Sequence, residues 1–304
     1  MVVKKRKPET KFEMNLVRLM ELFHSEDACR AYLEHLRWPN GVACLRCGSV
    51  SISRITTRNQ LDCNDCRLRF SITTGTIFHD THLPLWKWFL AAYTIIESKK
   101  GVSANQIKRE LGVAYKTAWY LCHRIRAAMS ESNPTRLSGT VEVDETWVGG
   151  KEHGRKGMRG GKTIVAGAIE RGGDTRMMVV SNVTRKTLHG FIRDHTDPET
   201  RRIMTDSWPA YLGIADEDTT HETVNHNIKE WVRGDVHTNS IENVWSLLKR
   251  SIMGSYHKLS AKHLDAYLDE LEWRFNNRDN PYLFRDTLVR LLQSEHLTYH
   301  SLVM

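Results

Sequence analysis

The sequence predicts a multidomain α+β protein, with a cysteine-rich and largely helical first half followed by an α/β domain. Four of its six cysteines form two tight pairs between residues 44 and 66. The next sixty or so residues carry helical patterns of apolar side chains, whereas residues 140–144, 164–169 and 175–180 are typical of successive strands. The change falls at a Ser-Asn-Pro linker. We expect domains at residues 12–78, 79–132 and 138–292.

The balance of charge favours a polyanionic partner, because the net charge of the 304-residue chain is +8. Its basic N-terminus leads into Pro8 rather than into an apolar stretch, so we expect no secretory signal. No segment approaches the ~18 apolar residues of a membrane span. We therefore expect a cytoplasmic protein, associated with the nucleoid when it binds DNA, and no membrane partner.

The paired cysteines predict a zinc ribbon. Cys44-Leu-Arg-Cys47 and Cys63-Asn-Asp-Cys66 are separated by fifteen residues, and each pair supplies two thiolates of a tetrahedral site. Gly48 suits the tight turn that follows the first pair. Four thiolates leave no coordination position open, so we expect one structural Zn²⁺ rather than a catalytic one.

Residues 103–129 fit a helix-turn-helix, with a short helix, a turn at Gly112 and a longer helix from Tyr115 to Met129. Such a pair can place its second helix in the major groove of DNA. The alternative is a helical hairpin with a solvated basic face. The polar or basic side chains that we expect to contact DNA on the second helix are Tyr115, Lys116, Thr117, His123, Arg124 and Arg126.

Three acidic residues are candidates for one metal site. Asp144 and Asp206 each end an apolar strand, and Glu242 begins a helix. Carboxylates brought together repel one another unless cations compensate, and Mg²⁺ or Mn²⁺ prefers such oxygen ligands. Two ions ~3.5–4 Å apart can activate the attacking oxygen and stabilise the leaving oxygen in phosphodiester chemistry. The alternative is that these acids are helix caps or solvated side chains.

Basic residues accompany the acids. Lys249 follows Glu242 by seven residues, which is two helical turns, so both lie on one face and Lys249 could meet a phosphate. A glycine-rich segment after Asp144 suggests a phosphate-tracking arm, although a solvated loop is the alternative. The remaining candidate DNA contacts are Lys151, Arg155, Lys156, Arg159, Lys162 and Arg250.

In this order the motifs resemble the DDE transposases of bacterial insertion sequences, in particular the ISXO-like branch with an N-terminal zinc ribbon. The residues that carry the resemblance are the cysteine pairs, the helix pair, Val141-Glu-Val-Asp144-Glu-Thr-Trp, Asp206-Ser-Trp and His237-Thr-Asn-Ser-Ile-Glu242. The likeness runs from about residue 26 to residue 278, which is most of the chain.

The resemblance implies a ribonuclease-H-like catalytic domain with a mixed sheet, and two Mg²⁺ ions per active site. It implies that the chain binds double-stranded DNA at the terminal inverted repeats of an element, exposes a 3′-OH by hydrolysis and transfers the strand into target DNA. Two ends must be held together, so a homodimer or a larger DNA-bound assembly is expected. Asp144 and Asp206 carry over as the first two acids.

The third position has three candidates, because part of this branch carries Asn in place of Glu. Asn243 and Asn239 both lie near Glu242. We choose Glu242, since a carboxylate binds Mg²⁺ better than an amide does and since Lys249 aligns with it.

Two other functions fit parts of the pattern. One is a DNA-binding regulator with a zinc ribbon and a helix-turn-helix, whose C-terminal domain only dimerises. The other is a nuclease with the same carboxylate chemistry but no strand transfer.

Overall fold

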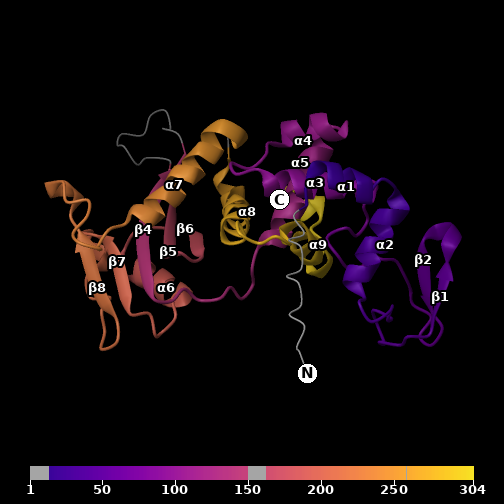
Figure 1. The fold of residues 1–304 in the computed structure, drawn as a ribbon, viewed down its shortest axis with the longest axis horizontal. Helices are drawn as coiled ribbons and strands as arrows, with labels where there is room; N and C mark the ends of the chain where they lie inside the picture. Colours follow the sequence, from indigo (N-terminus) through magenta and orange to yellow (C-terminus); the bar gives the residue numbers. More distant parts are fainter. Residues whose placement is uncertain (1–13, 150–161, 258) are drawn as a thin grey trace, which may run out of the picture. The chain divides into compact units, whose positions relative to one another are not determined.

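The computed structural model describes residues 14–149, 162–257 and 259–304, which form two compact units. Unit 1 contains the described residues up to 97 together with 107–128 and 278–304, and unit 2 contains 98–106 and 129–277. Figure 1 shows the chain coloured along its sequence. The cysteine-rich segment and most of the helix pair thus belong to one unit, which the chain re-enters at its C-terminus.

Unit 1 is helical apart from a small antiparallel sheet in the order β1-β2-β3. Its elements are α1 (Leu16–Leu22), α2 (Glu26–Arg37), β1 (Ile52–Ile55), a 3₁₀ turn (Thr56–Arg58), β2 (Gln60–Cys63), β3 (Arg69–Phe70), α3 (Leu85–Glu97), α5 (Tyr115–Met129, whose last residue belongs to unit 2), α9 (Leu283–Gln293) and α10 (Tyr299–Val303). Helix α4 (Ala104–Leu111) begins in unit 2 and ends in unit 1.

Helix α9 corrects the predicted domain boundary at residue 292. Phe284 of α9 lies with its ring 6.0 Å from that of Phe23 and 5.9 Å from that of Phe89, which is on α3. These aromatic rings form part of the core of unit 1, so α9 packs with the N-terminal helices. An aromatic ring buries a large apolar surface, so the place where it packs decides which unit the helix joins. For α9 that place is the core of unit 1, although α9 follows the helices of unit 2 in the sequence.

Unit 2 is built on a five-stranded mixed sheet in the order β6-β5-β4-β7-β8. Strand β5 pairs antiparallel with β4 and β6, whereas β7 is parallel to β4 and β8. Its elements are β4 (Thr140–Val148), β5 (Thr163–Glu170), β6 (Thr175–Val180), α6 (Arg185–His195), β7 (Arg202–Asp206), a 3₁₀ turn (Pro209–Tyr211), β8 (Thr220–Val224), a 3₁₀ turn (His226–Ile228), α7 (Asn239–Ser251), a π-helical turn (Ile252–Tyr256), a 3₁₀ turn (Ala261–His263) and α8 (Leu264–Asn276).

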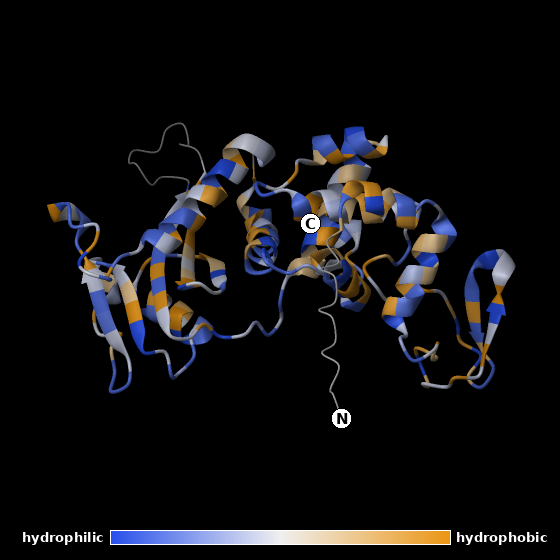
Figure 2. Cartoon of the chain, in the orientation of Figure 1, coloured by the Kyte–Doolittle hydropathy of each residue, from blue (hydrophilic) through white to orange (hydrophobic). Residues whose placement is uncertain are grey.

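Helices cover both faces of this sheet, so unit 2 has two apolar layers. Val141 and Val143 of β4 pack against Phe191 of α6 on one face. On the other face Val165 of β5 packs against Trp245 of α7 and against α8. In Figure 2 hydrophobic residues recur along these strands and helices, and β5 is buried without a break over residues 165–169, as expected for a strand covered on both faces.

Two features of the sheet differ from the sequence prediction. Strand β4 runs on to Val148, so Asp144 lies within the strand rather than at its end, because residues 145–148 continue the pairing with β5. Strand β8 was not predicted, since it is an edge strand with a single buried residue, Val224. None of the helices in the described ranges is long and apolar enough to cross a membrane.

Candidate functional site

Strands β4 and β7 place two of the predicted acids beside each other. Their parallel register pairs Glu142 with Met204, and two further residues along each strand lead to Asp144 and Asp206. Val143 and Ile203 point toward α6, so the alternation of the strands directs both carboxylates to the opposite face, which α7 covers. Asp144 and Asp206 thus lie on one face of the sheet, on neighbouring strands.

Asp144 is held in a setting that disfavours its charge. Part of the residue surface is exposed, yet protein atoms surround the carboxylate, and this burial raises its pKa from 3.8 to about 7. The charges of Glu145 and Asp206 act in the same direction. The indole Nε1 of Trp245 donates to Asp144 Oδ2 at 2.9 Å and opposes the shift. A cation beside Asp144 would relieve this penalty.

Glu242 lies in the first turn of α7, with its side chain 45% exposed. Thr238 Oγ1 donates to Glu242 Oε1 at 3.2 Å, and His226 Nε2 lies 3.9 Å from the same oxygen. His226 follows β8 and was not singled out in the sequence. Asn243 and Asn239 are also exposed on this helix, so geometry leaves all three side chains accessible to an ion.

The acids do not form a closed ligand cage. Among the described residues, the four cysteines are the one group of three or more metal-binding side chains whose ligand atoms all lie within 4.8 Å of one another. Asp144, Asp206 and Glu242 do not meet this limit as a group, and each offers carboxylate oxygens. That donor chemistry suits Mg²⁺, which keeps several waters and takes only one or two protein carboxylates directly.

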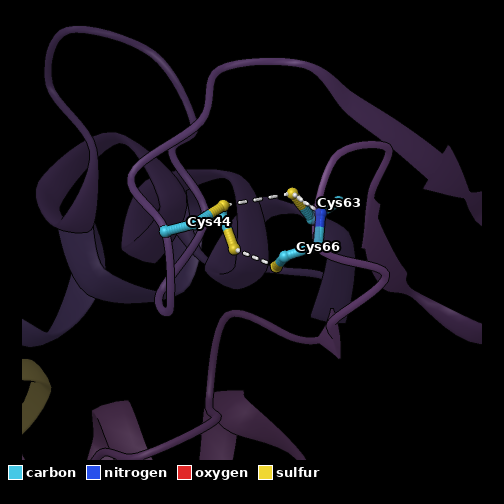
Figure 3. Close-up of side chains that lie close together, drawn as sticks. Cys44, Cys63 and Cys66 are labelled. Carbon is cyan, nitrogen blue, oxygen red and sulfur yellow. Dashed lines mark hydrogen bonds between the residues drawn. The ribbon is translucent and has the colours of Figure 1, made fainter.

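The cysteine site fits zinc. Cys44 Sγ lies 3.5 Å from Cys66 Sγ, and Cys47 Sγ lies 3.6 Å from Cys63 Sγ. A tetrahedron with Zn–S bonds of ~2.3 Å has edges of about 3.8 Å, close to these separations. Figure 3 shows the sulfur atoms of Cys44, Cys63 and Cys66 directed toward one another. The zinc ribbon has the ligand geometry of a structural site.

The two cysteine turns share one backbone design. Gly48 follows the first pair with φ of 72°, and Arg67 follows the second with φ of 59°. Gly48 N donates to Cys44 O and Arg67 N donates to Cys63 O, each at 3.0 Å. The predicted need for glycine after the first pair is met, whereas the second turn imposes the left-handed conformation on an arginine.

Helix α5 corrects the predicted DNA-facing surface. Tyr115 and Lys116 are exposed and Thr117 is half-buried, but His123, Arg124 and Arg126 are each at most 4% exposed. Three buried polar positions cannot lie on a solvated face, so the exposed part of that surface is confined to the first turn of the helix.

Contacts within unit 1 explain the burial of Arg124. Its guanidinium donates to the carbonyls of Ile77 and His79, and it lies 4.9 Å from the ring centroid of Trp88. Arg124 therefore joins α5 to the segment between β3 and α3. His123 packs its ring 4.4 Å from that of Trp119 on the same helix.

The basic residues predicted beside the acids fall into two groups. Lys249 and Arg250 are exposed near the end of α7, and Lys162 is half-buried before β5. Helix α7 includes both Glu242 and Lys249, so the predicted two-turn spacing holds. The other four, Lys151, Arg155, Lys156 and Arg159, lie outside the described residues.

One acid that the sequence analysis passed over is Glu142, which is 0% exposed. It sits between Val141 and Val143 on β4, two residues before Asp144. A glutamate between two valines in a central strand indicates a buried carboxylate, and a buried carboxylate needs hydrogen-bond or charged partners.

Comparisons with known proteins agree with these features. Residues 24–69 match the transposase zinc-ribbon domain, and residues 136–276 match the ISXO2-like transposase domain of IS1595 elements. A protein of the transposable element ISH50 of Halobacterium salinarum is 30% identical over 275 residues, which cover 84% of this chain and 92% of that protein. A transposase-like protein of Haemophilus influenzae is 30% identical over 102 residues, covering 34% of this chain and 80% of that protein.

Among solved structures, the Mos1 strand transfer complex covers 67% of this chain and 75% of the matched chain, at 11% identity and a TM-score of 0.30. The pre-cleavage Mos1 transpososome covers the same shares at 10% identity and a TM-score of 0.27. At such TM-scores the likeness carries no argument about this chain.

Proposed function

We propose that this chain, which belongs to the IS1595 family of insertion-sequence transposases, cuts and joins DNA strands with two divalent metal ions bound by Asp144, Asp206 and Glu242. The parallel register of β4 and β7, which puts Asp144 and Asp206 on one face of the sheet, and the hydrogen bond from Trp245 of α7 to Asp144 support the proposal. The sheet order, with β5 alone running against the other four strands, supports a ribonuclease-H-like domain.

The side chains of the site have separate tasks. Trp245 orients the carboxylate of Asp144, and the backbone amide of Trp208 donates to Asp206 Oδ1 at 3.0 Å. When bound, two Mg²⁺ or Mn²⁺ ions would activate the attacking oxygen and stabilise the leaving one. Lys249 and Arg250, exposed two turns beyond Glu242, hold a phosphate of the DNA backbone.

Unit 1 brings the DNA to this chemistry in our proposal. Helices α4 and α5 act as a helix-turn-helix that binds the terminal inverted repeats, and Tyr115, Lys116 and Thr117 face the duplex. One structural Zn²⁺ holds the ribbon in shape. The chain acts as a homodimer or a larger assembly, because two element ends must be joined to one target.

The test is strand transfer with DNA that carries the element's own inverted repeats, in Mg²⁺. Wild type should give joined products, and Asp144→Asn and Asp206→Asn should give none. Nicks without joining would indicate a nuclease instead. DNA binding without nicks would indicate a regulator built on the zinc ribbon and the helix-turn-helix.

A paired comparison identifies the third ligand. Glu242→Ala should abolish both steps, whereas Asn243→Ala on the same exposed face of α7 should retain them. The reverse result would move the third ligand to the neighbouring amide.

A further inference from the structure

The buried carboxylate of Glu142 lies at the start of α7. Glu142 Oε2 accepts hydrogen bonds from the backbone amides of Ser240 at 2.7 Å and Ile241 at 3.1 Å. Glu142 Oε1 accepts from Ser240 Oγ at 3.0 Å. These amides belong to the first turn of the helix, whose N–H groups have no partner inside the helix. A side chain of β4 therefore caps α7 across 98 residues of sequence.

Arg171 extends this contact to the turn before the helix. Its Nε donates to Glu142 Oε1 at 2.7 Å, while its two terminal nitrogens donate to the carbonyls of Asp235 and His237. His237 Nδ1 also lies 3.2 Å from Glu142 Oε1. The chain entering α7 is thus held at both its carbonyl and its amide groups, and Glu142 is the centre of the network.

We propose that Glu142 is a positioning residue, which sets the third acid of the site relative to the first without binding metal itself. The inference rests on the proposed function. Glu142 is two residues before Asp144 on one strand, and it holds the helical turn that contains Glu242. Because Glu142 is fully buried and its hydrogen bonds to the two amides are 2.7 and 3.1 Å long, they fix the spacing of the two acids.

The hydrogen bonds of Glu142 exclude it as a ligand. A carboxylate offers about four lone-pair positions. Its two oxygens already have five nitrogen or oxygen atoms within 3.2 Å. These atoms belong to Arg171, His237, Ser240 and Ile241. Glu142 therefore differs in role from Asp144, although both carboxylates lie on one face of β4.

Glu142→Gln tests the proposal, since an amide of the same shape directs an NH₂ group at donors that need an acceptor. We expect cleavage in Mg²⁺ to fall about 100-fold, as for a displacement of a catalytic group by about 1 Å. Hydrogen exchange of residues 239–245 should become about fivefold faster, as for loss of a helix cap. The Mg²⁺ midpoint of any residual cleavage should rise, while metal-free DNA binding stays unchanged.

The matched control is Glu170→Gln on the neighbouring strand β5. The Glu170 carboxylate also accepts a backbone amide, that of Ser138 at 2.9 Å. This substitution should leave cleavage and the exchange of α7 unchanged. Ser240→Ala removes one hydrogen bond of the network and should give a smaller loss, and combining it with Glu142→Gln should add little because both act through one contact. Ser240→Ala keeps the test open if Glu142→Gln does not fold.

Each outcome bears on the proposal. Cleavage close to wild type in Glu142→Gln overturns it. So does a loss of cleavage with unchanged exchange of α7, which would make Glu142 a ligand. If the wild-type chain neither nicks nor joins DNA, the proposed function fails, and hydrogen exchange alone then decides whether Glu142 holds the helix.

Discussion

Trp245 donates its indole Nε1 to Asp144 Oδ2 over 2.9 Å, so one helix contributes both the third acid and the group that orients the first. Trp245 follows Glu242 by three residues on α7. Its hydrogen bond favours the charged carboxylate and opposes the burial that raises the pKa of Asp144. The position of α7 and the protonation state of Asp144 are therefore linked.

Gly167→Ala should displace Trp245. Gly167 is the partner of Asp144 in the register of β4 and β5, and a Cβ added there would lie 2.3 Å from a ring carbon of Trp245. We expect a loss of about 1–3 kcal/mol in the free energy of unfolding, as for overpacking, together with reduced cleavage. Gly190→Ala on α6 is the control, because its Cβ meets no atom within 4 Å and alanine favours a helix. If Gly167→Ala were as stable as wild type in urea denaturation, the prediction would be contradicted.

Asp144→Asn should change how stability depends on pH in the metal-free protein. Folding raises the pKa of Asp144 from 3.8 to about 7, so the folded state favours the protonated acid. The contribution of Asp144 to the free energy of unfolding is fully present below about pH 4. It is lost as the pH rises through about 7. Wild type should therefore weaken relative to Asp144→Asn across this range, measured by thermal unfolding in EDTA. Parallel profiles would show that Asp144 ionises freely.

Mg²⁺ should reverse that loss only where the carboxylate is ionised. At pH 8 the ion should raise the melting temperature of wild type more than that of Asp144→Asn. At pH 5 protons compete for Asp144, so the difference between the two proteins should shrink. A stabilisation by Mg²⁺ that is the same in both proteins at pH 8 would indicate binding elsewhere.

The two cysteine turns should respond in opposite ways to substitution. Gly48→Ala puts a side chain at φ of 72° and should weaken the ribbon by about 1 kcal/mol. Arg67→Gly removes a side chain at φ of 59° and should not weaken it. The measurement is the rate of zinc release to a chelator. Faster release from Arg67→Gly than from Gly48→Ala would show that Arg67 contributes contacts beyond its backbone.

Lys116 and Arg124 should separate DNA binding from stability. Lys116 is exposed at the start of α5 and its Nζ lies 4.2 Å from the ring centroid of Tyr299, so Lys116→Ala should lower stability by no more than about 1 kcal/mol. It should also lower the salt slope of DNA binding by about one. Arg124→Ala leaves the carbonyls of Ile77 and His79 without their donor. It should lower the free energy of unfolding by about 1–3 kcal/mol. If Arg124→Ala were as stable as wild type but bound DNA weakly, Arg124 would be a DNA contact, as the sequence predicted.

Much of the secondary structure followed from local patterns. The sequence predicted the bounds of α5 (Tyr115–Met129) and β6 (Thr175–Val180) as they occur. The four zinc ligands were equally clear, since a C-x-x-C turn needs only its own residues and one partner pair. Strand β8 escaped because an edge strand with one buried side chain lacks the alternation that identifies a strand.

The sequence by itself determined the zinc ligands and most of the helices and strands, and it singled out Asp144 and Asp206 as candidates, because each inference depends on residues close together in the chain. Tertiary structure decided that Arg124 is buried, that Phe284 belongs to the core of unit 1 and that Glu142 caps α7. These contacts join residues 47 to 98 positions apart or pack rings from both ends of the chain. A polar side chain on a helix or strand shows the same local pattern whether it faces water or a buried partner, and folding supplies the difference.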